Sequence, residues 1–334
     1  MNIMEYIYYS FLAGWCADAV GARLEFRKTT FTEKEAIDAM HFIGEKTNSI
    51  NEGQFTDDSE MEISLLDALL EGKDDPYFPI ERIAKKYIQW FKSKPFDIGL
   101  TTTLALFGAK TADHMSTNAF INNENSESNG SMMRCVPIAA FSISKPYETI
   151  LEIAELDASL THYSTVVKLS TGIYCCILSE ILSKRLCQNE LVVHLLLKDV
   201  ENLCQRNETI LKWFNNAISI LNLNDYNAII NEGHVKHAFT MVIYFLKHID
   251  HYTYEKAIME VLKCGGDTDT NAKIVANLFG AYYGNCIPEY MMKPVLEFEC
   301  TKSRVKFYKR PEKYGIKNGL KLVDELLKKY EAKQ

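Results

Sequence analysis

Positive charge is scarce in this sequence. Its 37 lysines and arginines stand against 44 aspartates and glutamates, which gives a formal net charge of -7 over 334 residues. A protein that holds nucleic acid needs clustered basic side chains to displace the counterions of the phosphates. We therefore expect no general nucleic-acid binding, although a local basic pocket stays open.

The cysteine patterns of metal and disulfide frameworks are also missing. The nine cysteines are an odd number and lie mostly in apolar stretches, such as residues 174–177. A reduced thiol in such surroundings behaves as a small hydrophobe. No Cys-x2-Cys pair is followed by a second pair or by His-x3-His, so we expect no structural zinc.

Signals for export, membrane anchoring and domain separation are absent as well. Residues 1–5 carry no basic leader, and Asp18 interrupts the first apolar run. No Pro/Ser-rich linker or composition break divides the chain. We predict one cytoplasmic domain over residues 1–334, with no membrane partner, as a monomer.

What the sequence does contain is apolar spacing of three and four residues, while alternating strand patterns are scarce. This predicts an all-α fold. The clearest helical stretches are residues 79–91, 164–186, 209–221, 237–248, 254–262 and 320–330. Two polar segments, residues 41–55 and the Asn-rich residues 112–131, are predicted to be long loops that contact substrate.

The first acidic cluster, Thr56-Asp57-Asp58, leads directly into an apolar stripe that begins at Met61. The acids therefore lie at a predicted helix start. One interpretation is a capping box, with Asp57 as N-cap and Glu60 three residues later. Acids at this end are also favoured by the helix dipole.

The second cluster, Asp267-Thr268-Asp269-Thr270, follows two glycines and precedes another apolar stripe. Capping explains one acid per helix, whereas the extra carboxylates would repel one another unless a cation neutralised them. Carboxylate and threonine oxygens suit Mg²⁺ or Mn²⁺. If the two helix starts meet in space, the six side chains could hold a pair of ions; spacing alone does not decide that.

Five ordered segments resemble the ADP-ribosylglycohydrolase family, which includes the dinitrogenase reductase-activating glycohydrolases. The most specific is GGDTDTNAKIVANLFGAYYG at residues 265–284. The others are GWCADAVGARLEF at 14–26, FTDDSEM at 55–61, NGSMMRCVP at 129–137, and Thr161-His162. The likeness runs from about residue 8 to Pro288 and leaves residues 289–334 as a C-terminal helical extension.

The resemblance implies a compact orthogonal multi-helix bundle with a binuclear metal site in a cleft. It implies hydrolysis of the N- or O-glycosidic bond between ADP-ribose and a modified protein side chain or a small acceptor. Two Mg²⁺ or Mn²⁺ ions would be held by residues that match the family's ligands, of which Asp57, Asp58 and Asp269 would be catalytic: Thr56, Asp57, Asp58, Asp267, Asp269 and Thr270.

Other site residues follow from the same resemblance. Glu25 matches an acid that assists at the metal site, which indicates an acid/base or substrate-orienting role; a solvated loop acid is the alternative. Asp18 matches a structural acid, with Ala17 in place of the family's usual glycine. Gly99 belongs to a segment, residues 97–102, that resembles one lining the cleft.

The Asn-Gly turn at residues 129–130 resembles the family loop that wraps the diphosphate and ribose, though Asn-Gly is also a common turn. The expected substrate contacts are Asn129, Gly130, Ser131, Met133 and, by its match to a histidine near the phosphates, His162. A histidine at a helix start is otherwise an ordinary capping-region residue. The chain departs from the family's glycine-rich pattern at residues 126–128, where Glu127 would repel a diphosphate unless it points away.

Two alternatives to the hydrolase remain open. A catalytically inactive ADP-ribose-binding or crystallin-like relative would also carry these motifs, and the departure at residues 126–128 keeps this alternative open. A metallohydrolase acting on phosphates would use the same pair of ions. All six ligand-type residues are retained, and the order of the motifs favours the ADP-ribosyl hydrolase.

Overall fold

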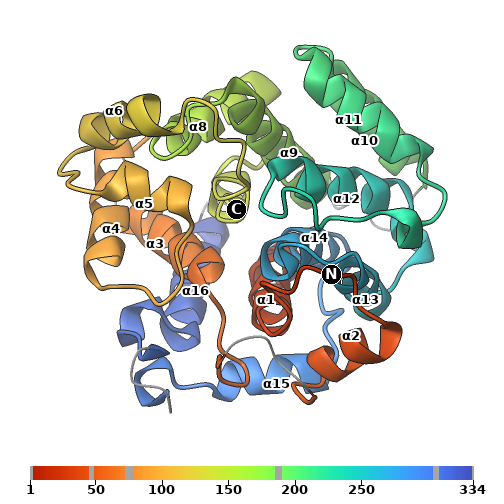
Figure 1. The fold of residues 1–334 in the computed structure, drawn as a ribbon. Helices are drawn as coiled ribbons and strands as arrows, with labels where there is room; N and C mark the ends of the chain where they lie inside the picture. Colours follow the sequence, from red (N-terminus) through yellow and green to blue (C-terminus); the bar gives the residue numbers. More distant parts are fainter. Residues whose placement is uncertain (1–2, 45–48, 72–77, 185–189, 304–307, 333–334) are drawn as a thin grey trace.

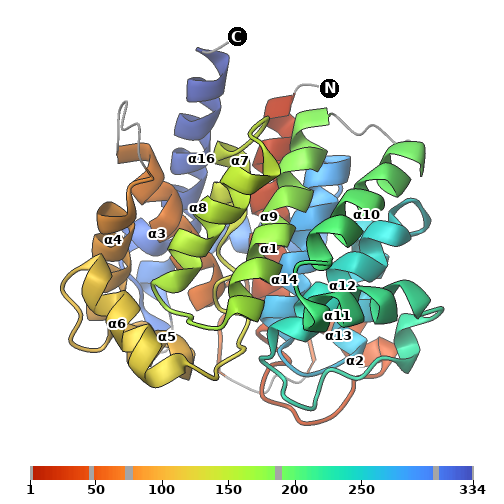
Figure 2. The ribbon, with the colours of Figure 1, turned by 90° about the horizontal axis from the view of Figure 1, so that it is seen from above.

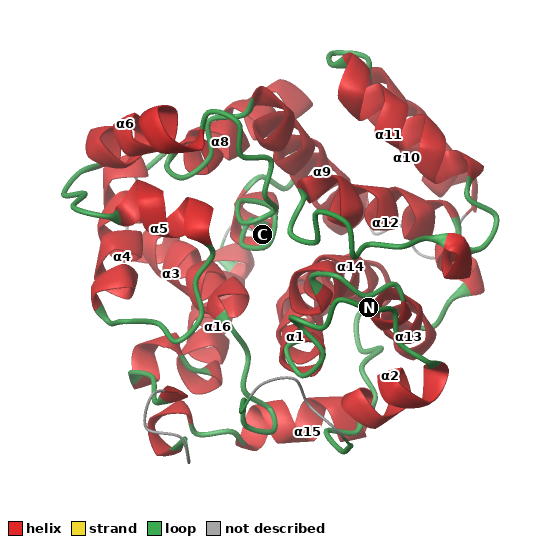
Figure 3. Ribbon diagram, in the orientation of Figure 1, coloured by secondary structure: helices red, strands yellow, loops and turns green. Residues whose placement is uncertain are grey.

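The structure is a computed structural model that describes residues 3–44, 49–71, 78–184, 190–303 and 308–332. Within these ranges it contains sixteen α-helices and no β-strand (Figure 3). The all-α prediction is therefore confirmed. The α-helices are α1 (Ile3–Gly21), α2 (Glu33–Met40), α3 (Asp57–Glu71), α4 (Ile80–Lys92), α5 (Leu100–Leu106), α6 (Ala112–Asn123), α7 (Val136–Phe141), α8 (Tyr147–Ser159), α9 (Thr165–Lys184), α10 (Glu190–Cys204), α11 (Glu208–Ser219), α12 (Val235–Lys247), α13 (Tyr254–Lys263), α14 (Thr268–Tyr283), α15 (Glu289–Glu297) and α16 (Ile316–Glu331).

Helices α1 and α14 lie side by side at the centre, with α9 and α12 next to them (Figure 1 and Figure 2). Helices α3 to α6 gather on one side of this centre and α10 and α11 on another. The C-terminal helix α16 packs against α1 and α3. Residues beyond 288 lie outside the recognised motifs, but they help to cover α3, the helix that carries Asp57.

Small residues allow α1 and α14 to run antiparallel at very close range. A Cβ atom added to Gly21 would lie 2.4 Å from the Thr268 carbonyl oxygen, and one added to Gly280 would lie 2.1 Å from the Tyr9 carbonyl oxygen. Backbones can approach this closely only where no side chain separates them. The contact at Gly21 brings the C-terminal end of α1 to the start of α14, where the second acidic cluster lies.

We expect Gly280→Ala to destabilise the protein by about 2 kcal/mol. The better helix propensity of alanine contributes up to about 1 kcal/mol, but overpacking a tight core contact costs up to about 3 kcal/mol. Urea unfolding followed by circular dichroism measures the difference. The control is Gly99→Ala, because a Cβ there meets no heavy atom within 4 Å; equal midpoints for the two variants would contradict the packing argument.

The segment at residues 112–131 corrects a sequence-based prediction. Most of it is the helix α6, not a loop, and only residues 124–131 lack a helix. Thr111 caps the helix by accepting a hydrogen bond from the His114 N–H. Asn123 donates hydrogen bonds to the carbonyl oxygens of Thr101 and Thr161. These tertiary contacts outweigh the weak helix propensity of asparagine.

The other predicted segments agree with the structure. The six predicted helical stretches fall on α4, α9, α11, α12, α13 and α16, although the last two residues of the 164–186 stretch lie outside the described residues. The described part of residues 41–55 contains no helix. By length and hydropathy, α9 between Thr165 and Ser183 could cross a membrane, but most of that stretch is buried among the other helices, as in the core helix of a water-soluble protein.

Candidate active site

The starts of α3 and α14 meet in space. The Thr270 hydroxyl lies 3.3 Å from Asp58 Oδ2, and the Thr56 hydroxyl lies 3.4 Å from the same oxygen. Thr56, Asp58 and Thr270 are all buried. The structure thus brings the two acidic clusters together, which is the condition that the sequence left open.

The capping interpretation of the two clusters is wrong. Asp57 lies inside α3, and the Glu60 carboxylate binds Trp90 and Arg310. Asp18 of α1 serves the start of α3 instead, because its carboxylate accepts hydrogen bonds from the backbone N–H groups of Thr56 (2.9 Å) and Ser59 (3.1 Å). A side chain from another helix satisfies these donors, so the acids of α3 are available for another purpose.

At the start of α14, too, the acidic side chain does not cap the helix. Asp267 is the residue before α14, but its side chain makes no capping hydrogen bond. Its Oδ2 accepts a hydrogen bond of 2.8 Å from the Asn129 side-chain amide. The predicted substrate loop is thereby tied directly to the second acidic cluster.

These elements enclose a cavity of about 370 Å³. It is bordered by the turn that follows α1, by the starts of α3, α5 and α14, by the Asn129 loop, and by the segment before α12. Ten predicted site residues line it: Glu25, Asp57, Asp58, Gly99, Asn129, Gly130, Met133, Asp267, Asp269 and Thr270. Three do not, namely Thr56, Ser131 and His162.

The cavity concentrates negative charge away from water. Burial, and after it the repulsion of neighbouring carboxylates, raises the pKa of four acids well above the ordinary range: Glu25, Asp57, Asp58 and Asp269. Burial likewise raises the pKa of Asp97 to about 7, and the charges of Asp18 and Asp267 add to the shift. So many acids in one cavity are costly unless protons or cations neutralise them.

The donor set fits divalent cations. Among the described residues, Glu25, Asp267 and Asp269 each place one carboxylate oxygen within 4.8 Å of the others. Two buried oxygens, Oδ1 of Asp58 and Oδ1 of Asp269, have no hydrogen-bond partner within the described part of the chain. Buried polar atoms normally have partners, and hard oxygen donors are those that Mg²⁺ and Mn²⁺ prefer.

Comparison with known proteins gives the family. The model of the ADP-ribosylglycohydrolase family matches residues 2–331. The chain belongs to that family. It is 30% identical over 313 residues, 87% of this chain and 90% of the other, to a protein of Acanthamoeba polyphaga mimivirus that is provisionally named an ADP-ribosyl glycohydrolase. It is 24% identical to the ADP-ribosyl-dinitrogen reductase glycohydrolase of Rhodospirillum rubrum, covering 82% of this chain and 84% of that one.

A solved structure described as an ADP-ribosylglycohydrolase-related protein complex has the same fold. It superposes with a TM-score of 0.70, covers 98% of each chain and is 20% identical in sequence. The expected ADP-ribosylglycohydrolase bundle is therefore confirmed. The family match is longer than the span of residues 8–288 over which the motifs are recognised.

His162 of this family member lies behind the Asn129 loop. It is fully buried, with Nε2 bonded to the Ser128 hydroxyl and Nδ1 to the Thr161 hydroxyl, both at 2.8 Å. Burial, and then the Arg134 charge, lowers the pKa of His162 to about 3, so the ring is neutral. A Cβ added to Gly130 would lie 3.3 Å from the His162 ring, so the histidine supports the loop from behind.

The rest of the Asn129 loop is held by buried groups. The Ser131 hydroxyl bonds to Thr171, outside the set of residues that line the cavity. Arg134 donates to the Gly130 carbonyl oxygen (3.2 Å) and forms a fully buried ion pair with Asp157 (3.1 Å). A loop fixed in this way presents its backbone to the cavity with little entropy left to lose on binding.

The Glu127 side chain contacts His234. Its carboxylate lies 3.0 Å from His234 Nε2, and the residue does not line the cavity. Backbone hydrogen bonds from Val235 to Glu127 and from Asn129 to Gly233 hold the two segments together. The sequence predicted that Glu127 would repel a diphosphate unless it points away, and the Glu127 carboxylate lies against His234.

The cavity-lining acid Asp97 belongs to the segment 97–102, which the resemblance placed along the cleft without giving Asp97 a role of its own. Sequence reasoning missed a second cavity-lining acid, Glu232. Glu232 lies in the turn before α12, and nothing in its neighbouring residues marks it. The exposed side chains of Phe26 and Leu100 border the same cavity.

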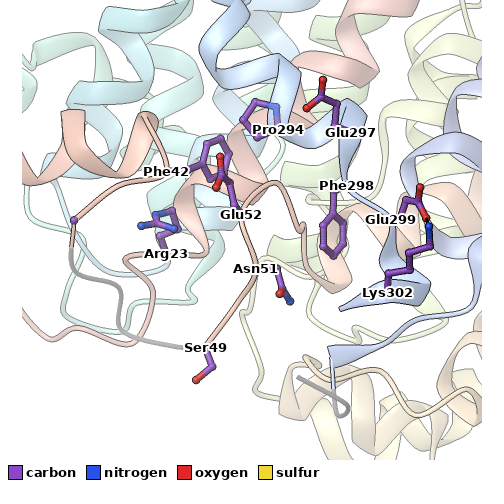
Figure 4. Close-up of a pocket in the computed structure, with 11 residues that line it drawn as sticks. Arg23, Phe42, Ser49, Asn51, Glu52, Pro294, Glu297, Phe298, Glu299 and Lys302 are labelled. Atoms are coloured by element: carbon purple, nitrogen blue, oxygen red, sulfur yellow. Dashed lines mark ion pairs between the residues drawn. The ribbon is translucent and has the colours of Figure 1, made fainter. Parts of the chain in front are cut away.

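A larger cavity, of about 770 Å³, lies elsewhere and shares no lining residue with the acidic one (Figure 4). Arg23 borders this larger cavity, whereas Glu25, two residues later in the chain, borders the acidic one. Its charged groups partly neutralise one another, as in the pair of Lys302 with Glu299 at 2.5 Å. None of the individually predicted site residues borders this cavity, but the segment 41–55, which was predicted to contact substrate, supplies five of its lining residues.

Proposed function

We propose that this protein is a divalent-cation-dependent hydrolase that releases ADP-ribose from a modified protein side chain or a small acceptor. The observation that carries the proposal is the meeting of the α3 and α14 starts, with their buried carboxylates, in one cavity. Because Asp18 caps α3, Asp57 and Asp58 are not needed to cap that helix. Family membership supplies the class of substrate.

The residues that would hold the cations are those at the two helix starts. The fit rests on the orphaned oxygens of Asp58 and Asp269 and on the oxygen-only donor set. When bound, two Mg²⁺ or Mn²⁺ ions would orient the ribose hydroxyls and lower the pKa of a hydrolytic water. Our assignment is Thr56, Asp57, Asp58, Asp267, Asp269 and Thr270, with Glu25 next to Asp267 and Asp269.

The chain's own groups account for the proton transfers. In the reaction the bond from ribose C1″ to the acceptor atom breaks, and a bond from C1″ to a water oxygen forms. One proton of that water must leave, and the acceptor must gain one. Glu25 borders the cavity beside two of the proposed ligands, so we assign it the acid and base role.

The Asn129 loop would orient the substrate. Gly130 lies close to the His162 ring because it has no side chain, and its carbonyl oxygen is fixed by Arg134. Asn129 is fixed by Asp267. We propose that backbone groups of this loop contact the ribose and the diphosphate, which needs no net positive charge.

The test is ADP-ribose release from a panel of arginine-, serine- and carboxylate-linked substrates. We expect release from at least one linkage in the presence of Mg²⁺ or Mn²⁺, a loss of at least about a hundredfold with EDTA, and recovery when the ion is restored. Activity that EDTA does not change would refute the cation requirement. Tight ADP-ribose binding without release from any linkage would support the inactive, ADP-ribose-binding alternative.

A further inference from the structure

A buried ion pair joins α3 to α14 one helical turn beyond the acidic clusters. The Lys273 ammonium lies 2.8 Å from Glu62 Oε2, and both side chains are completely buried. The other carboxylate oxygen of Glu62 accepts a hydrogen bond of 2.8 Å from the Trp15 indole N–H of α1. Helices α1, α3 and α14 are thus tied together at one point.

The positions of Glu62 and Lys273 repeat those of the acids above them. Glu62 follows Asp58 by four residues, and Lys273 follows Asp269 by four. Residues four apart lie on the same face of a helix, separated by about 6 Å along its axis. The face of α3 that presents Asp58 therefore presents Glu62 one turn deeper, and α14 presents Lys273 below Asp269 in the same way.

Stability alone does not explain this pair. Removing two charges from water costs several kcal/mol, and well-packed apolar side chains of similar volume are often at least as stabilising. An ion pair does constrain geometry, because its length and direction are fixed by hydrogen bonds at both ends. Here the constraint acts between the two helices whose first turns carry the acids.

We propose that Glu62 and Lys273 are a positioning pair that sets the separation of the α3 and α14 starts and thereby the affinity of the site between them for divalent cations. The inference rests on the proposed function, since it assumes that Asp58 and Asp269 hold cations. Neither residue of the pair lines the cavity. Their effect is exerted through the helices that carry the ligands.

The test is a calorimetric titration of metal-free protein with Mn²⁺, which needs no substrate. We expect Glu62→Gln to weaken Mn²⁺ binding by about ten- to a hundredfold, as is typical when groups behind metal ligands are changed. The control is Tyr254→Phe, because Tyr254 is also fully buried and its hydroxyl donates a hydrogen bond of 2.8 Å to the Ala13 carbonyl oxygen of α1. Tyr254 does not line the cavity.

A second variant is needed because Glu62→Gln leaves the Lys273 charge buried without its partner, which destabilises the folded protein. The double variant Glu62→Gln with Lys273→Met removes both charges and keeps the approximate volumes. We expect it to unfold at a higher urea concentration than Glu62→Gln alone and still to bind Mn²⁺ at least about tenfold more weakly than the wild type.

The outcomes separate the two proposals. A wild type that binds no Mn²⁺ refutes the proposed cation site, and the inference with it. If the wild type binds but the double variant binds equally well, only the positioning role is overturned. Equal weakening by Tyr254→Phe would also overturn it, because the effect would then be general loosening of the core.

Discussion

Asp269→Asn is expected to abolish ADP-ribose release, by on the order of a thousandfold, without destabilising the metal-free protein. The loss corresponds to about 4 kcal/mol of transition-state stabilisation, in the range that a bound cation supplies. Stability should hold because Asp269 is buried among other acids, and its Oδ1 has no hydrogen-bond partner among the described residues. An amide has nearly the same shape and removes one repelling charge.

Initial rates with saturating Mn²⁺ and urea unfolding in EDTA measure the two halves of this prediction. The control is Asp113→Asn, which changes an exposed acid in the first turn of α6, at the same kind of helical position. That variant should keep its rate. If Asp269→Asn unfolded more easily than the wild type in EDTA, Asp269 would be a structural residue, and the lost activity would say little about cations.

Metal-free protein is expected to become more stable as the pH falls from 8 to about 5.5. Burial raises the pKa of Asp97 to about 7 and that of Asp57, Asp58 and Glu25 well above the ordinary range. In the unfolded chain the same groups titrate near 4. Between these values the folded protein binds more protons than the unfolded chain, so the free energy of unfolding rises as the pH is lowered.

Thermal unfolding in EDTA at several pH values tests this. The slope should be smaller in Asp57→Asn, which removes one of the titrating acids. Saturating Mn²⁺ should raise the unfolding temperature most at pH 8, because cation binding requires ionised carboxylates. A metal-free protein whose stability rose towards pH 8 would contradict the buried, repelling acids that the structure contains.

The acids of the cavity therefore destabilise the fold, whereas buried ion pairs just outside the cavity hold the surrounding helices together. Three fully or nearly fully buried ion pairs surround the acids: Glu60 with Arg310, Glu62 with Lys273, and Asp157 with Arg134. Each of their carboxylates also accepts a hydrogen bond from an aromatic side chain. Functional sites often carry such local cost, which a rigid surround must hold in place.

The contribution of the C-terminal segment was not visible in the motifs. Arg310 donates to both carboxylate oxygens of Glu60 and to the carbonyl oxygens of Ser93 and Lys94. It thereby fixes the first turn of α3 to the end of α4, shortly before Asp97. The sequence could not predict this contact, because its partners are some 215 to 250 residues apart.

The sequence by itself determined the helical class, the starts of the two acid-bearing helices and, through five ordered motifs, the family. Those features depend on local periodicity and on short runs of residues. Only the tertiary structure decided that Asp18 caps α3, that α6 is a helix, that His162 supports its loop from behind, and that Glu127 turns to His234. Each of these depends on a partner far along the chain, and a hydrogen bond or a buried charge is satisfied in space, whatever the separation in sequence.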